Sequence, residues 1–212
     1  MSSYSLYIQI NTRPYQYAQI CCFQRNPGAG ATEVMSLAWL LQPIASLGPN
    51  GPNAMISFGW QTTPCFIWGE TGPLKPGITF GPSQVANVDI NGTEYNKITL
   101  GYRGFYEFVG QDMGGEPGTL SIAESREIPA NMLASVGIGM SGTGTFIAQA
   151  TAGANLVFSG QPEYWLAAGN FSKGEVLAAG AISNSVQVVF PQGVFQMEAT
   201  LNADSTWTLQ YD

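Results

Sequence analysis

The chain has 212 residues, of which 10% are charged and none is histidine, and its formal net charge is −7. The seven basic residues are spread along the chain, so nucleic acids and anionic membranes are not expected partners. Without histidine the chain lacks the commonest general base, nucleophile partner and transition-metal ligand, so we expect no enzyme activity and no cofactor.

Alternation of apolar and polar residues is the dominant pattern, and it predicts β-strands along the whole chain. In chain order, the alternating segments are 6–10, 56–60, 136–140, 146–150, 195–201 and 207–211. The last two are joined by the turn residues Asn202-Ala203-Asp204-Ser205, which predicts a β-hairpin.

Gly and Pro recur between these segments at short intervals, which indicates an antiparallel β-sandwich with little helix. Segment 32–42 is ambiguous, because its apolar residues fit a short helix and a buried strand equally well. We expect one all-β unit over residues 1–212, and the Gly-rich stretch 111–118 is the boundary if two β lobes exist.

The two halves of the chain show a faint similarity. Pro64-Cys65-Phe66-Ile67-Trp68 and Pro162-Glu163-Tyr164-Trp165-Leu166 both begin with Pro and an aromatic run, and a Lys-containing turn ending in Gly follows each. Two related halves would explain this, but chance in a Gly-rich β protein explains it too, and chance is the preferred interpretation.

Three cysteines occur, Cys21 and Cys22 side by side and Cys65 further along. A bridge from Cys65 to either neighbour would leave an odd thiol, so free, buried thiols in a reducing compartment are the preferred interpretation. The N-terminus has no basic segment followed by an apolar run, and no apolar stretch reaches ~18 residues. We therefore expect a cytoplasmic protein, with release by another route left open.

Two motifs suggest ligands, and both have simpler explanations. Gly137-Ile138-Gly139-Met140-Ser141-Gly142 matches a dinucleotide-binding pattern, but strand-like residues follow where that motif requires a helix. A bulge or a close approach of another strand is favoured there. Asp89, Asn91 and Glu94 surround a turn, as in calcium loops, but lack the EF-hand spacing, which leaves a weak calcium candidate and no firm metal site.

Carboxylates and aromatic rings supply the remaining candidates. Glu70, Asp112, Glu116 and Glu163 would suit an acid–base pair for glycoside hydrolysis, but nothing in the sequence brings two of them to one cleft. No catalytic residue is therefore assigned.

Five tryptophans are the candidate ligand or interface residues, because flat rings stack on sugars and anchor protein interfaces. Each also lies in an apolar or alternating run, so a core position is the simpler explanation. They are Trp39, Trp60, Trp68, Trp165 and Trp207.

Four groups of residues carry a family pattern that covers nearly the whole chain: Ser36–Trp39; Trp68–Gly72 with Pro76-Gly77 and Gly81–Gln84; Ser135–Phe146; and Ala199–Asn202 with Trp207-Thr208. They resemble the RhiA family of rhizosphere-expressed bacterial proteins. The resemblance implies an abundant, quorum-regulated, cytoplasmic bacterial protein linked to life around plant roots, and it transfers no catalytic residue.

We therefore expect a non-enzymatic β-sandwich that acts by self-association or surface interaction, with itself as partner in an oligomer or array. The low charge leaves little repulsion between neutral, aromatic-bearing surfaces. A lectin-like carbohydrate-binding module, with a glycan as partner, is the first alternative. A membrane-active β toxin is the second, because the strands of 136–151 are Gly/Ser/Thr-rich and could rearrange into a barrel.

Overall fold

The computed structural model describes residues 2–11, 17–25, 33–44, 54–88, 95–131 and 133–211. These residues form seventeen strands and one short 3-10 helix, Ala179–Ile182 (η1). The expected all-β fold with little helix is confirmed. None of the helical residues described here forms a segment long and apolar enough to cross a membrane.

Along the chain, the strands fall into two consecutive sets that meet between β9 and β10. The first half of the chain contains β1 (Ser3–Ile10), β2 (Gln19–Arg25), β3 (Met35–Ser36), β4 (Leu40–Pro43), β5 (Ala54–Gln61), β6 (Pro64–Glu70), β7 (Gln84–Asn87), β8 (Lys97–Tyr102) and β9 (Tyr106–Asp112). The second half contains β10 (Thr119–Glu124), β11 (Ala134–Met140), β12 (Thr143–Gln149), β13 (Asn155–Ser159), β14 (Glu163–Gly169), β15 (Ser185–Val188), β16 (Gln196–Leu201) and β17 (Trp207–Gln210).

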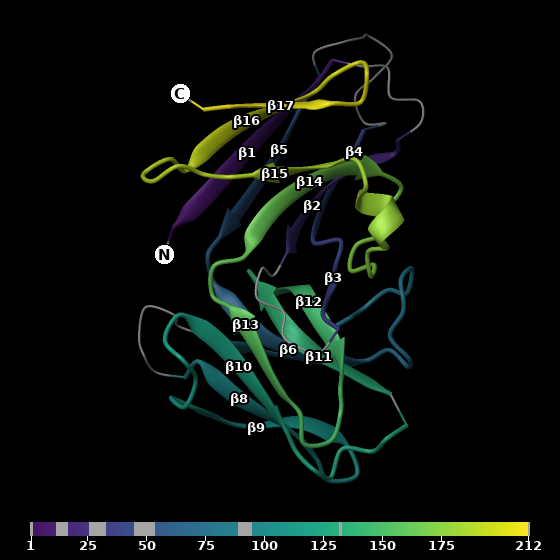
Figure 1. Ribbon diagram of the computed structural model, residues 1–212, viewed down its shortest axis with the longest axis vertical. Coiled ribbons are helices and arrows are strands. Elements are labelled where there is room, and N and C mark those ends of the chain that lie inside the picture. The colour runs from purple at the N-terminus through teal and green to yellow at the C-terminus, as the bar shows by residue number, and fades with distance from the viewer. Residues whose placement is uncertain are drawn as a thin grey trace.

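Figure 1 shows two lobes arranged along the long axis of the molecule. The upper lobe in that view contains the sheets β17-β16-β1-β5 and β15-β14-β2-β4. The lower lobe contains the sheets β13-β10-β8-β9 and β3-β12-β11-β6-β7. Each lobe is thus a sandwich of two sheets.

The two halves of the chain are intertwined between these lobes. Strands β1, β2, β4 and β5 lie in the upper lobe, β3 and β6 to β13 lie in the lower lobe, and β14 to β17 return to the upper lobe. The chain crosses between lobes on either side of β3, then at residues 62–63, and again at 160–162. Each lobe therefore needs strands from both halves of the chain.

The pairing shows that the halves repeat the same topology. β1 and β10 each pair in parallel with one neighbour and antiparallel with another. Ile8 of β1 lies between Ala199 and Ile56. Ile122 of β10 lies between Ile98 and Leu156. Parallel pairs are the minority in mostly antiparallel folds, so the same one in each lobe is difficult to attribute to chance.

The similarity between 64–68 and 162–166 falls on β6 and β14, which hold the same place in the two lobes. The topology thus supports two related halves, against the interpretation by chance. The 111–118 stretch joins β9 to β10 within the lower-lobe sheet, so it separates the two repeats and not the two lobes.

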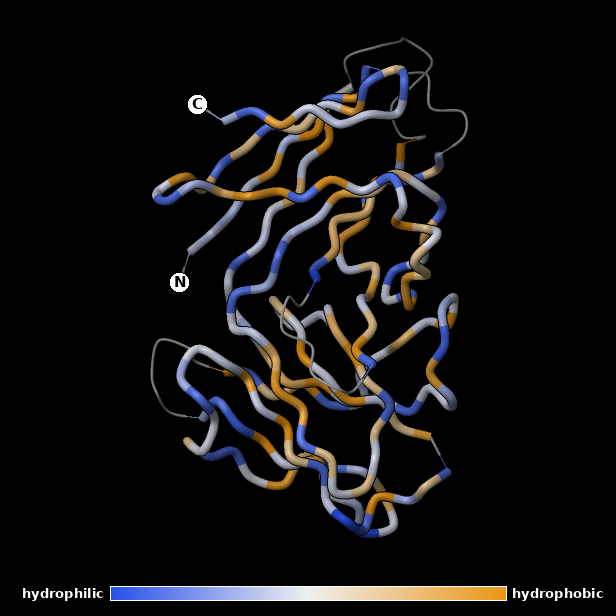
Figure 2. The backbone as a smooth tube through the Cα atoms, in the orientation of Figure 1, coloured by the Kyte–Doolittle hydropathy of each residue, from blue (hydrophilic) through white to orange (hydrophobic). Residues whose placement is uncertain are grey.

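Each lobe has its own apolar core between its sheets, and Figure 2 shows apolar residues recurring along the strands. The outer face of the sheet containing β14 is also covered, by residues Phe171 and Leu177. Phe80 and Val176 cover the corresponding sheet of the lower lobe. The segment that contains Phe80 pairs at Thr79 with Glu175 of the segment that contains Phe171, Val176 and Leu177, and this pairing ties the lobes together.

Two ambiguous segments are settled by these sheets. Within the described part of 32–42 the chain is extended, as β3 and the start of β4, so it is strand and not helix. The Gly-rich motif lies in the β11–β12 hairpin, with a register shift between Ile138 and Gly139. A Cβ atom on Gly137 would lie 1.9 Å from the carbonyl oxygen of Phe146. The predicted bulge and close approach are therefore confirmed.

Candidate functional site: an aromatic platform and its pocket

Five aromatic rings gather at one end of the upper-lobe sandwich. We call them the aromatic platform: Tyr4 of β1, Trp60 of β5, Tyr164 of β14, and Phe190 and Phe195 of the loop between β15 and β16. The ring centroid of Tyr4 lies 5.7 Å from that of Trp60, 4.6 Å from Phe190 and 5.6 Å from Phe195. The rings thus form one continuous cluster that ends at the half-exposed Phe195.

Local sequence explains how the platform is placed. Tyr4 and Trp60 are cross-strand partners, two residues beyond the partners Leu6 and Phe58, so they extend the inward-facing row of the sheet. Tyr164 comes from the facing sheet, with its ring 5.0 Å from that of Trp60. Cross-strand aromatic pairs of this kind rigidify the end of a sandwich.

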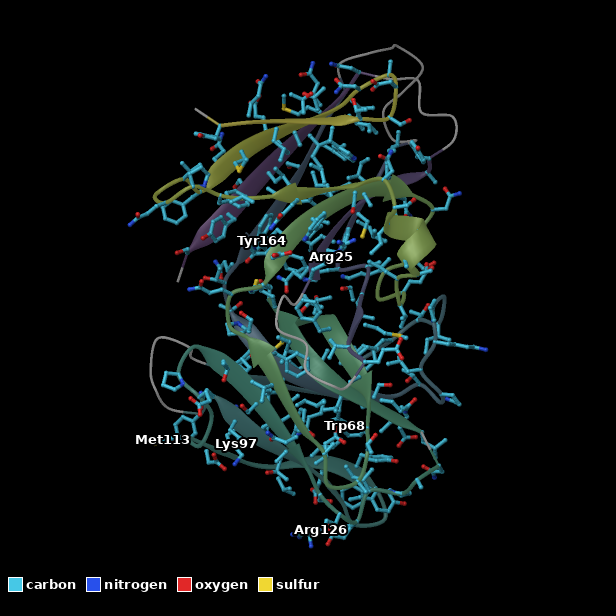
Figure 3. All side chains as sticks on the ribbon, in the orientation of Figure 1. Arg25, Trp68, Lys97, Met113, Arg126 and Tyr164 are labelled. Atoms are coloured by element: carbon cyan, nitrogen blue, oxygen red, sulfur yellow. The ribbon has the colours of Figure 1, made fainter. Side chains whose placement is uncertain are left out.

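Met140, at the end of β11 in the lower lobe, anchors the platform to the lobe junction. Its carbonyl oxygen accepts a hydrogen bond from Trp39 Nε1 at 3.3 Å. Its sulfur accepts weak hydrogen bonds from Gln24 Nε2 at 3.4 Å and from the Tyr164 hydroxyl at 3.6 Å. Figure 3 places Tyr164 on the side of the upper lobe that faces the lower lobe.

Burial sets the chemistry of the platform. Burial raises the pKa of the Tyr164 hydroxyl to about 12, and the neighbouring Tyr4 contributes to the rise. This phenol is therefore a neutral hydrogen-bond donor at physiological pH. Trp60 Nε1 is buried, and no acceptor among the described residues meets it in hydrogen-bond geometry.

The second lobe shows that the fold does not require the platform. Leu6 and Phe58 correspond to Leu120 and Phe158, which pair across β10 and β13 in the same register. Continuing this register, Tyr4 and Trp60 correspond to Gly118 and Gly160, which are joined by a backbone hydrogen bond of 2.9 Å. One lobe thus places two large rings where the other has no side chain.

A pocket of about 390 Å³ lies beside Phe195 on the upper lobe. We call it the β16–β17 pocket, because residues from these strands and their flanking segments line it: Gly193, Val194, Phe195, Gln196, Met197, Glu198, Gln210 and Tyr211. It combines two exposed rings with two amides and one carboxylate. The described lining contains no basic residue.

The five candidate tryptophans divide into two groups. Trp39, Trp60 and Trp68 are buried in the cores of the two lobes. Trp165 and Trp207 are partly exposed, on β14 and β17. Arg25 stacks on the Trp165 ring, 4.1 Å from its centroid, and Trp165 Nε1 donates to Glu163 at 3.1 Å. Only these two present accessible ring surface.

The carboxylate candidates do not form one described site. Glu163 lies in the upper lobe and is used by Trp165, whereas Glu70, Asp112 and Glu116 lie in the lower lobe. Asp112 accepts a hydrogen bond from Gly114 N at 2.7 Å within its own turn. In the described residues, no group of three or more His, Cys, Asp or Glu side chains could hold a metal ion. The calcium candidates Asp89, Asn91 and Glu94 lie outside the described residues.

The three cysteines are free and buried, as expected for small apolar residues. Burial raises the pKa of the Cys21 thiol to about 12 and that of Cys65 to about 11, and it raises that of Cys22 well above its ordinary value. Thiols with such pKa values are poor nucleophiles. The question of a bridge from Cys65 to Cys21 or Cys22 is thereby answered in favour of free thiols.

Sequence reasoning missed Phe190, Phe195 and Tyr211. Alternation assigned Phe195 to the inner row of Met197 and Ala199, but β16 begins only at Gln196 and Phe195 is 48% exposed. The one available signal was the placement of two Phe residues in a Pro/Gly loop, where a core position is less common.

The chain is similar to known proteins over most of its length. The family model RhiA matches residues 2–212. "Protein RhiA" of Rhizobium leguminosarum bv. viciae is 36% identical over 190 residues, which is 88% of this chain and 78% of that protein. No solved structure matches. The match over almost all residues shows that this chain belongs to the RhiA family.

Proposed function

We propose that this protein is a non-catalytic RhiA-family protein that associates with itself through the edges of its β-sheets. The rhizobial relative supports a rhizosphere-related context for this association. A non-enzymatic role is further supported by the absence of histidine from the chain and by the high pKa values of its buried thiols.

One observation carries the proposal: the strands that end the sheets carry almost no charge. Among the described strands, the four sheets end on β17 and β5, β13 and β9, β3 and β7, and β15 and β4. Only β9 contains charged residues, Glu107 and Asp112. Soluble proteins normally protect sheet edges with charged side chains, proline or bulges, because an open edge pairs with another strand. Of the other seven, β4 alone has a proline, Pro43.

Strand β13 is the most suitable edge for this pairing. It has the sequence Asn-Leu-Val-Phe-Ser, and among the described strands it pairs only with β10, on one side. Its outward-facing Val157 is exposed. Its counterpart in the upper lobe, β5, is also uncharged, but Gln42 Nε2 donates to the Ser57 carbonyl oxygen at 3.1 Å and covers part of that edge. We therefore expect β13 of one copy to pair with β13 of another, which extends two four-stranded sheets into one.

Sedimentation velocity of the full chain tests the proposal. The unmodified protein should form a defined oligomer at micromolar concentration and neutral pH. Val157→Lys should return it to monomer, because a lysine on an edge strand disfavours pairing. Leu133→Lys is the matched control, since Leu133 is equally exposed but lies outside the strands, and it should leave the oligomer intact. A monomeric unmodified protein, or an oligomer that survives Val157→Lys, would refute edge pairing.

A further inference from the structure

We propose that the β16–β17 pocket is a saccharide site that binds a neutral pyranose ring. This inference goes beyond self-association and does not rest on it, because β13 and the pocket lie in different lobes. It rests on four features of the pocket: its rings, its polar groups, its lack of cations and its difference from the equivalent surface of the lower lobe.

The pocket has two aromatic surfaces, and one of them, Phe195, is held in place before any ligand arrives. Phe195 is 48% exposed and Tyr211 is 60% exposed, so both present ring surface to solvent. Tyr4 contacts Phe195 and also Phe190, which fixes both ends of the loop between β15 and β16. A rigid ring costs little entropy on binding, and the apolar C–H face of a pyranose suits such a ring.

The pocket lining also contains polar groups that suit hydroxyl groups. Glu198 and Gln210 are direct cross-strand partners, so their side chains lie on the same face of the sheet. Gln196 lies two residues before Glu198 on that face. An amide offers donors and acceptors, whereas a carboxylate only accepts, and a sugar hydroxyl can pair with both.

The charge and the volume of the pocket disfavour other common ligands. None of the described residues that line the pocket is basic, which disfavours phosphate, nucleotide and carboxylate ligands. The single carboxylate, Glu198, instead favours neutral ligands with hydroxyl donors. A volume of about 390 Å³ is within the usual range of small-molecule sites and suits a mono- or disaccharide.

The lower lobe provides a built-in comparison. Ala199 pairs with Ile8 in the upper lobe as Ile98 pairs with Ile122 in the lower lobe, so Ala199 and Ile98 are equivalent. Counting back along the two strands, Glu198 corresponds to Lys97 and Gln196 corresponds to Tyr95. The cross-strand partner of Lys97 is Asp112, which corresponds to Gln210. Met113 then corresponds to Tyr211. The sheet therefore accepts a Lys–Asp pair at these positions, so the amide and aromatic set of the upper lobe is not imposed by folding.

Ligand-observed saturation-transfer NMR on the full chain tests the site. The probes are methyl β-glucopyranoside, methyl β-galactopyranoside, methyl α-mannopyranoside and cellobiose, with glucose 1-phosphate as a charged comparison. We expect at least one neutral probe to bind with a Kd on the order of 1 mM, as is usual for so small a ligand, and glucose 1-phosphate to bind more weakly.

Three variants locate the binding. Tyr211→Ser and Glu198→Gln should each weaken binding of the neutral probe about tenfold or more, and both positions are exposed, so folding should be unaffected. Met113→Ser, at the equivalent exposed position of the lower lobe, should leave binding unchanged. The proposal would be overturned if no probe showed saturation transfer at 10 mM. It would also be overturned if Tyr211→Ser and Glu198→Gln left the saturation transfer unchanged. Sedimentation velocity on the same variants reports separately on self-association.

Discussion

Glu124 is a buried carboxyl whose ionisation should lower the stability of the fold. It lies at the end of β10, is 4% exposed, and accepts a hydrogen bond from Thr151 N through one oxygen. Its other oxygen, Oε1, is buried and meets no donor among the described residues. The equivalent residue in the upper lobe is Ile10, so the other lobe has an apolar side chain at this core position. The perturbation is Glu124→Gln, which keeps the shape and removes the charge.

Burial raises the pKa of Glu124 from 4.5 to about 7, against the smaller opposing effect of the Thr151 N–H. Below pH 4.5 the carboxyl is protonated in the folded and the unfolded chain, so it costs nothing. Between pH 4.5 and 7 only the unfolded chain loses the proton, so stability falls as the pH rises. Above pH 7 the loss is complete. A shift of about 2.5 units at 1.36 kcal/mol per unit amounts to about 3 kcal/mol.

Urea unfolding followed by tryptophan fluorescence from pH 5 to 8.5 measures this effect. The quantity to read is the unfolding free energy of Glu124→Gln minus that of the unmodified chain. It should rise by roughly 2–3 kcal/mol between pH 5 and 8 and then level off. Any loss caused by the new amide in the core is independent of pH and cancels in this change. Glu116→Gln, at an exposed carboxyl, should show no such rise. A flat difference across this range would refute the reasoning.

Three further predictions follow from the packing. Gly137→Ala should destabilise the fold by more than ~2 kcal/mol in urea unfolding, because its Cβ would lie inside a carbonyl oxygen, whereas Gly81→Ala, with nothing within 4 Å, should change little. The thiols of Cys21 and Cys65 should react with a disulfide reagent at pH 8 only after unfolding, and fast reaction of the native chain would contradict their burial. A protease site inserted in 113–118 should yield two fragments that co-elute on native gel filtration, since each lobe needs strands from both, and their separation without denaturant would disprove the intertwined topology.

Local sequence patterns predicted the strands where one face of the strand is buried. Leu6, Ile8 and Ile10 alternate with less buried residues because β1 has one face on the core and one face outward. Alternation also predicted β11, where Val136, Ile138 and Met140 alternate with glycines, but all seven residues of this strand are buried because both faces of the sheet are covered. There the glycines indicated only that backbones approach closely.

The arrangement of the strands was beyond local patterns. The parallel pairing of β1 with β16 joins the two ends of the chain, and no turn residue encodes it. The same holds for the site. Indole size favours tryptophan as a binding residue, but Trp39 and Trp60 are covered by strands from distant parts of the chain. Phe195 is exposed because it is the last residue of the loop before β16, which begins at Gln196.

Because the fold places the same topology in each lobe, differences between equivalent positions separate what folding requires from what it does not. The edges β5 and β13 are uncharged in both lobes, whereas the set of Phe195, Gln210 and Tyr211 occurs in one. On the two proposals together, an assembly built through sheet edges carries one saccharide pocket per chain. Several weak sites on one particle bind a polyvalent surface far more tightly than one site does.

This reasoning gives a last prediction, on retention by immobilised glycoside. The oligomeric chain should be retained by a densely coated resin that carries the neutral glycoside bound in solution. Val157→Lys should pass through with little delay, even though its Kd for the free glycoside in NMR is unchanged, because its substitution lies far from the pocket in the other lobe. Tyr211→Ser should also pass through while remaining oligomeric. Retention of the Val157→Lys monomer equal to that of the unmodified chain would show that multivalency has no part in binding.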